Sequence, residues 1–163
     1  MSGFGRVALI GCGHIGGSLA LALRAAEPAV HIVGCDRDSA SAERARVLGI
    51  VDSIAASPAE AAAGAALVIL AVPVGAMGAI AAQLPGDSVV TDVGSTKADV
   101  VTACEAALGA RFVGAHPMAG SERHGPDAAD DVAFVQQVAD DIRARIQDAL
   151  NGMLGQRRSV WFG

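Results

Sequence analysis

A glycine-rich segment, Gly11-Cys12-Gly13-His14-Ile15-Gly16, constrains this chain more than any other feature of its sequence. The segment fits the pattern G-x-G-x-x-G. It follows an apolar run at Val7 to Ile10 and opens a helical stretch at Ile15 to Ala26. In this order, a tight turn presents backbone N–H groups to a phosphate at the start of a helix. Because the chain holds 20 glycines, the match depends on the strand and helix around it.

Each position of this loop has a steric or electrostatic reason. Gly11 allows the tight turn, Gly13 lets the backbone approach a diphosphate, and Gly16 lets the helix pack close to the strand. The first N–H groups of the helix, at His14 and Ile15, lie where the helix dipole favours an anion. The loop therefore predicts a dinucleotide cofactor held at these five residues. We interpret the His14 side chain as part of the helix start and not as a catalyst.

The rest of the chain alternates short apolar runs with longer helical stretches. This alternation is typical of βαβ units in a parallel sheet covered on both faces. The sequence thus predicts an α/β fold, a Rossmann-type doubly wound parallel sheet, over residues 1–130. Ser57, Pro58 and Glu60 predict a capped helix start, and Gly49 predicts a helix end. The strands are expected at Val7 to Ile10, His31 to Cys35, Leu67 to Val72, Ser88 to Val93 and Phe112 to Ala115.

Two further segments are expected to contact the cofactor. Asp36 closes the second strand, 25 residues after Gly11, near the spacing of the acid that binds the adenosine ribose. Its carboxylate would repel a 2′-phosphate, which favours NAD over NADP. The neighbouring Arg37 could instead pair with a 2′-phosphate, so NADP stays open. Val72 and Pro73 end a buried strand and should border the nicotinamide side of the crevice.

The composition excludes several classes of function. The net charge is -5, only 3% of residues are aromatic, and no basic stripe is present, so nucleic acid is not an expected partner. No apolar run approaches the length of a membrane span. Three scattered cysteines, Cys12, Cys35 and Cys104, form no metal-binding spacing and suggest a reduced, cytoplasmic compartment. No metal site is expected.

Two segments with reactive side chains follow the later strands: Thr91-Asp92-Val93-Gly94-Ser95-Thr96-Lys97 and Gly114-Ala115-His116-Pro117-Met118-Ala119-Gly120-Ser121-Glu122. With the glycine loop and Ala71-Val72-Pro73-Val74, their order resembles the prephenate/arogenate dehydrogenase family of tyrosine biosynthesis. The second segment is the most diagnostic, and the likeness covers about residues 5–130. It implies an oxidoreductase that transfers hydride to NAD(P) and releases carbon dioxide from prephenate or arogenate, while the ring becomes aromatic.

The resemblance also implies roles for individual side chains. Loss of hydride from a carbinol requires the hydroxyl proton to reach a base, and His116 suits this role near neutral pH. Ser95 matches a family serine and would orient the hydroxyl or His116. By the same carry-over, Ser121 and Glu122 would border the substrate.

Residues 131–163 do not match the helical domain that follows the cofactor domain in this family. Val132 to Leu154 instead predicts an amphipathic helix. Its apolar stripe should pack on the open edge of the sheet or on a second subunit, and a homodimer is favoured over a monomer. The stripe consists of Val135, Val138, Ile142, Ile146 and Leu150.

Three functions are therefore open. The chain is an active family dehydrogenase that takes missing groups from a partner, an NAD-binding module without turnover, or an enzyme of the β-hydroxyacid dehydrogenase type. The segment from His116 to Glu122 argues against the third.

Overall fold

The computed structural model describes residues 3–94 and 97–114, together with residues 144, 146, 148, 151 and 152. Strands and helices alternate along the first two ranges, and every strand pair is parallel. The strands are β1 (Arg6–Ile10), β2 (His31–Cys35), β3 (Ser53–Ile54), β4 (Leu67–Leu70), β5 (Val89–Asp92) and β6 (Phe112–Val113). The helices are α1 (His14–Ala26), α2 (Ser39–Val47), α3 (Pro58–Ala62), α4 (Val74–Ala81) and α5 (Lys97–Leu108), followed by the 3₁₀ turn η1 (Gly109–Arg111).

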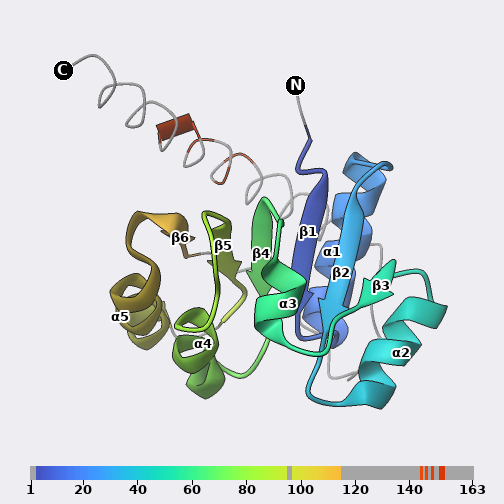
Figure 1. Cartoon of the computed structure of the whole chain (residues 1–163), viewed down its shortest axis with the longest axis horizontal. Helices are drawn as coiled ribbons and strands as arrows, with labels where there is room; N and C mark the ends of the chain where they lie inside the picture. The colour runs from blue at the N-terminus through green and yellow to red at the C-terminus, as the bar shows by residue number, and fades with distance from the viewer. Residues whose placement is uncertain are drawn as a thin grey trace.

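The sheet has the strand order β3-β2-β1-β4-β5-β6. The chain thus builds outward from β1 to one edge, returns to the centre at β4, and builds outward to the other edge (Figure 1). This is the Rossmann order, in which the reversal between β1 and β4 opens a ligand crevice at the carboxyl ends of the strands. The predicted fold class is confirmed.

Both faces of the sheet are covered, so its central strands are buried throughout. Val7, Leu9 and Ile69 face one hydrophobic cluster, which α1 and the end of α2 complete. Ala8 and Ile10 face the other cluster, which α3, α4 and α5 complete. Figure 1 shows α1 behind the sheet and α3 and α4 in front of it. The unbroken apolar runs in the sequence reflect this two-sided burial.

Capping residues explain where several helices begin and end. The Ser57 hydroxyl accepts a hydrogen bond from the N–H of Glu60, and the Glu60 carboxylate accepts one from the N–H of Ala56. This pair caps α3 as the sequence predicts. Gly49 has φ +74° just after α2, the conformation that ends a helix most readily at glycine.

Some predicted boundaries are wrong. Strand β4 ends at Leu70 and not at Val72, since the chain must turn before Pro73 starts α4. The sequence reading also missed β3, because two residues, one of them serine, leave no apolar run to detect.

The C-terminal residues that the structure describes are helical, as expected for the predicted amphipathic helix. Ile146 is fully buried in the cluster behind the sheet, whereas Ala144 and Asp148 are exposed. The other predicted stripe residues, Val135, Val138, Ile142 and Leu150, lie outside the described residues. At Ile146, therefore, the stripe packs on the chain's own core.

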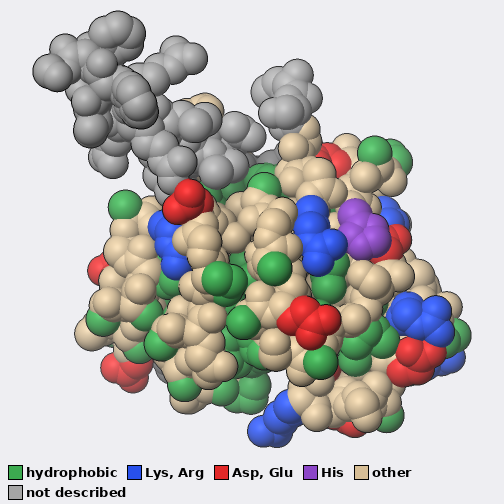
Figure 2. Space-filling model, viewed as in Figure 1, with side chains coloured by type: hydrophobic (Ala, Val, Ile, Leu, Met, Phe, Trp, Pro, Cys, Tyr) green, Lys and Arg blue, Asp and Glu red, His purple; other side chains and the backbone are tan. Residues whose placement is uncertain are grey.

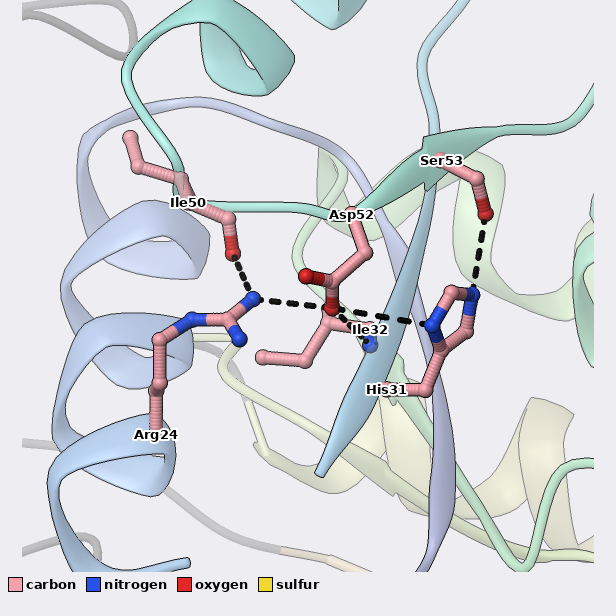
Figure 3. A network of polar contacts seen from close by, with 6 residues as sticks. All are labelled: Arg24, His31, Ile32, Ile50, Asp52 and Ser53. Atoms are coloured by element: carbon pink, nitrogen blue, oxygen red, sulfur yellow. Dashed lines mark hydrogen bonds and ion pairs between the residues drawn. The ribbon is translucent and has the colours of Figure 1, made fainter. Parts of the chain in front are cut away.

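A polar network joins the amino ends of β2 and β3 to the last turn of α1 (Figure 3). The Asp52 carboxylate accepts hydrogen bonds from the Arg24 guanidinium at 2.9 Å and from the N–H of Ile32 at 2.7 Å. His31 lies 3.9 Å from the same carboxylate oxygen, and its other ring nitrogen contacts the Ser53 hydroxyl at 3.2 Å. The network holds the last turn of α1 against the amino ends of β2 and β3, at the opposite end of the strands from the glycine loop.

Charged side chains are spread over the surface that Figure 2 displays. Basic and acidic groups alternate there with hydrophobic ones and do not gather in one patch. Across the described part of the chain, no helix has both the length and the apolar character needed to cross a membrane.

Candidate functional site

A pocket of about 410 Å³ lies where the carboxyl ends of β1, β2 and β4 meet. It is the crevice expected at the reversal of strand order. Six residues predicted to bind a cofactor line it: Gly11, Gly13, Asp36, Arg37, Val72 and Pro73. The remaining lining residues are Ile10, Cys35, Ala56, Pro58, Ala71, Ala76 and Ile80.

The glycine loop closes tightly against the end of β4. Gly11 has φ +98°, and its N–H donates to the Cys35 carbonyl at 2.8 Å. A Cβ at Gly11 would overlap the Ala71 carbonyl group, with the carbonyl carbon at 2.6 Å. A Cβ at Gly16 would lie 2.8 Å from the Ala71 side chain and 2.5 Å from the Gly11 carbonyl oxygen. Side chains at these two positions would force α1 away from the sheet.

Gly13 differs from these two glycines. Its backbone has φ -80° and ψ -163°, which other residues adopt readily, and nothing lies within 4 Å of a Cβ built there. Gly13 is also the N-cap of α1, and no side chain caps this helix. The first N–H groups of α1 are thus left for a bound group. His14, Ile15 and Gly16 form this first turn, although they do not line the pocket.

The His14 imidazole carries a polar atom that lacks a partner. Its Nδ1 is buried and makes no hydrogen bond. A buried polar atom without a partner is costly, and such atoms often mark a site that a ligand completes. This observation fits a polar group bound near the first turn of α1.

Asp36 links the second strand to the glycine loop. One carboxylate oxygen accepts from the N–H of Cys12 at 2.8 Å, and the other accepts from the N–H of Asp38 at 2.9 Å. An ionised carboxylate has about four acceptor positions, so about two remain for hydroxyl groups in the pocket. Arg37 beside it is exposed and makes no ion pair with any other described residue.

The cysteines near the pocket are packing residues. Burial, followed by the nearby charges of Asp36 and Cys35, raises the pKa of Cys12 to about 12. Burial likewise raises the pKa of Cys35. Both thiols are free and neutral at physiological pH, which leaves them poor nucleophiles. In the described residues, no group of three His, Cys, Asp or Glu side chains is placed to hold a metal ion.

The predicted catalytic segments begin at the same edge of the sheet. Asp92, at the end of β5, is fully buried and accepts from the N–H of Gly94 at 2.8 Å. Thr91 donates to the Val113 carbonyl at 2.7 Å and so ties β5 to the end of β6. The predicted catalytic residues Ser95 and His116 lie outside the described residues, and so do the predicted substrate contacts Ser121 and Glu122.

Several pocket residues were not found from the sequence. Ala56 and Pro58 follow β3, the strand that was missed, while Ala76 and Ile80 lie on α4. These side chains are small or apolar and carry no chemical pattern of their own. They could have been found only from the topology of the sheet, because they follow strands that end at the crevice.

Comparison with known proteins places this site in a family. Residues 19–139 match the family model for the prephenate dehydrogenase nucleotide-binding domain. The chain is 39% identical over 135 residues to the prephenate dehydrogenase of Bacillus subtilis, covering 78% of this chain and 36% of that protein. It is 38% identical over 133 residues to the cyclohexadienyl dehydrogenase of Zymomonas mobilis, covering 78% of this chain and 45% of that protein.

A solved structure is similar as well. It is the prephenate dehydrogenase of A. aeolicus in complex with hydroxyphenyl propionate and NAD+, which superposes with a TM-score of 0.74 at 31% identity. The superposition covers 88% of this chain and 56% of that one. The chain thus spans about half or less of the length of these relatives. Because the family model matches more than half of its residues, the chain belongs to the prephenate dehydrogenase nucleotide-binding domain family.

Proposed function

We propose that this chain binds NAD(H) in the pocket at the carboxyl edge and is the cofactor-binding part of a dehydrogenase that oxidises and decarboxylates prephenate or arogenate. The observation that carries the proposal is the composition of the pocket. It joins the loop before an uncapped helix start, a carboxylate with free acceptor positions, and an apolar wall. These three features match the diphosphate, the ribose and the adenine ring of a dinucleotide.

Each part of the cofactor has a set of residues to hold it. The N–H groups at the start of α1 would bind the diphosphate, next to the open space at Gly13. Asp36 would accept hydrogen bonds from the ribose hydroxyls. Ala56, Pro58 and Ile80 offer an apolar wall for the adenine ring. When bound, NAD+ supplies the acceptor for the hydride that leaves the carbinol carbon.

The proton and the substrate are assigned to the segments after β5 and β6. His116 would take the hydroxyl proton as the carbonyl forms, and Ser95 would orient that hydroxyl. Ser121 and Glu122 would border the substrate. The ends of β5 and β6 support this assignment, because each segment starts from the edge of the sheet that holds the pocket.

The cofactor assignment is tested with Gly13→Val. A branched side chain there meets no protein atom at its Cβ but enters the space next to the first turn of α1. We expect NAD+ affinity to fall at least about a hundredfold in calorimetric titration, while circular dichroism and urea unfolding stay near wild type. Unchanged affinity would refute the assigned pocket. A wild-type chain that does not bind NAD+ would refute the proposed function.

The catalytic assignment is tested by turnover of prephenate and arogenate. The match to the family model ends at residue 139, and these 163 residues span only 36% to 45% of the curated relatives, so we expect weak turnover from them alone. His116→Asn should abolish whatever turnover is measured, with NAD+ affinity within about twofold of wild type, since asparagine cannot accept the proton. Turnover that survives this change would refute the role of His116. NAD+ binding with no turnover of either substrate would favour a binding module.

A further inference from the structure

The turn between β2 and α2 carries a second carboxylate beside the pocket. Asp38 is the N-cap of α2, two residues after Asp36. Its N–H donates to the Asp36 carboxylate at 2.9 Å, so the two residues are joined by one hydrogen bond. Asp36 lines the pocket and is the residue proposed to bind the adenosine ribose. Any group attached to the ribose 2′ position would therefore approach this turn.

The Asp38 carboxylate occupies two hydrogen-bond donors at the start of α2. One oxygen accepts from the N–H of Ala40 at 3.1 Å, and the other accepts from the Ser41 hydroxyl at 2.7 Å. These hydrogen bonds, first the one from Ser41, lower the pKa of Asp38. The side chain is therefore ionised at neutral pH. The start of α2 already holds an anion that belongs to the protein.

Three consecutive residues determine the charge of the turn between β2 and α2. Arg37 is the one cation among them and lines the pocket, but carboxylates stand on both sides of it in the sequence. The turn Asp36-Arg37-Asp38 thus has a net charge of -1 where a 2′-phosphate would lie. A phosphate of about two negative charges would meet repulsion there and would have to compete with Asp38 for the Ala40 N–H and the Ser41 hydroxyl.

From this geometry we infer that Asp38 is a specificity-determining residue that excludes NADP by placing a second negative charge beside Asp36, at the amino end of α2. The inference rests on the proposed function, because it assumes that the adenosine ribose binds at Asp36. It assigns the preference for NAD to two carboxylates and not to Asp36 alone. Removing the charge of Asp38 should change the net charge of the turn from -1 to 0, so that Arg37 can attract a 2′-phosphate.

The test is the affinity of Asp38→Asn for NAD+ and NADP+, measured by calorimetric titration. Asparagine caps helices as well as aspartate does, so the variant keeps the start of α2 while losing the charge. We expect NADP+ affinity to rise about tenfold and NAD+ affinity to stay within about twofold. The remaining gap between the cofactors should narrow as salt is raised, since exposed charges are screened.

Glu43→Gln is the matched control. It removes one exposed carboxylate from the same helix, but Glu43 pairs with Arg46 and lies more than one turn from the pocket end. The control should leave the NAD+ to NADP+ ratio unchanged. An unchanged NADP+ affinity in Asp38→Asn, or an equal gain in Glu43→Gln, would overturn the inference. Loss of the proposed function itself would look different, because the wild-type chain would then bind neither dinucleotide.

Discussion

The amino ends of the strands, here called the amino edge of the sheet, differ in their polar groups from the starts of α1 and α4, which lie at the carboxyl ends of the strands, the carboxyl edge. At the amino edge, charged side chains satisfy one another: Asp52 accepts from Arg24 and from the backbone of Ile32, and Glu27 accepts from the N–H of Phe4 at 2.9 Å. At the carboxyl edge, α1 starts at Gly13 and α4 at Pro73, and neither start has a side-chain cap. Both of these positions line the pocket.

This difference predicts that the stability of the fold and the affinity for a cofactor depend on different residues. Hydrogen bonds between groups of the chain itself hold α1 and the strands together, whether or not a ligand is present. Backbone N–H groups without a side-chain partner do not stabilise the free chain, but they can donate hydrogen bonds to a ligand. Changes at the amino edge should therefore alter unfolding without altering cofactor affinity. At the carboxyl edge, only residues that also support the packing should alter unfolding.

The largest effect on unfolding is expected from Gly11→Ala, because Gly11 is a residue of the carboxyl edge that also supports the packing. The methyl group would force a positive φ on alanine and would overlap the Ala71 carbonyl group. We expect a loss of about 3 kcal/mol in the free energy of unfolding, from conformational strain and overpacking together. Urea unfolding gives this value directly. Gly13→Ala is the control, and its unfolding midpoint should stay near wild type; equal losses in the two variants would show that the loop is not held by close contact.

A smaller effect is expected from Asp52→Asn at the amino edge. Burial raises the pKa of Asp52, but hydrogen bonds from Arg24 and Ile32 and the charges of Arg24 and His31 outweigh it, and the pKa is lowered from 3.8. The charge interaction is therefore present above the unfolded pKa and is lost as the pH falls through the lower folded pKa. We expect the variant to lose about 1 kcal/mol of unfolding free energy at pH 7, since the ion pair is partly exposed.

The measurement is urea unfolding of both chains at pH 7 and at pH 3. The difference between wild type and Asp52→Asn should shrink at the lower pH, and NAD+ affinity at pH 7 should be the same for both. Glu105→Gln, which removes an exposed carboxylate from α5, should change the free energy of unfolding by less than about 0.5 kcal/mol. A fall in NAD+ affinity in Asp52→Asn would break the proposed separation of the two edges.

The sequence predicted those parts of the fold that depend on long apolar runs or on residues with a special backbone. The buried strands β1, β2 and β4 and the turn at Gly11 belong to this group. It did not predict β3, or the pocket wall formed by Ala56 and Ile80, because a two-residue strand and small apolar side chains resemble any other part of an alanine-rich chain. Such walls are defined by topology.

The role of the Asp38 carboxylate likewise could not be predicted from the sequence. The structure makes Asp38 the N-cap of α2, and its hydrogen bond to Asp36, the proposed ribose-binding acid, depends on how the turn after β2 is folded. Residue types alone left Asp36 and Arg37 in competition. The hydrogen bonds of the turn show that the charge of Asp38 must be counted together with those of Asp36 and Arg37.

The central position of β1 has a consequence for how the chain folds. Val7 pairs with Ile32 on one side and with Leu67 on the other, so the second pairing closes a loop more than twice as long as the first. Closing the longer loop costs more chain entropy, and pairings between distant residues slow folding. The unit β1-α1-β2 can therefore form early, while the wall at Val72 and Pro73 arrives only when β4 docks. A folding intermediate that lacks β4 would carry the glycine loop without a crevice, so a nucleotide would bind and stabilise only the chain that has completed this step.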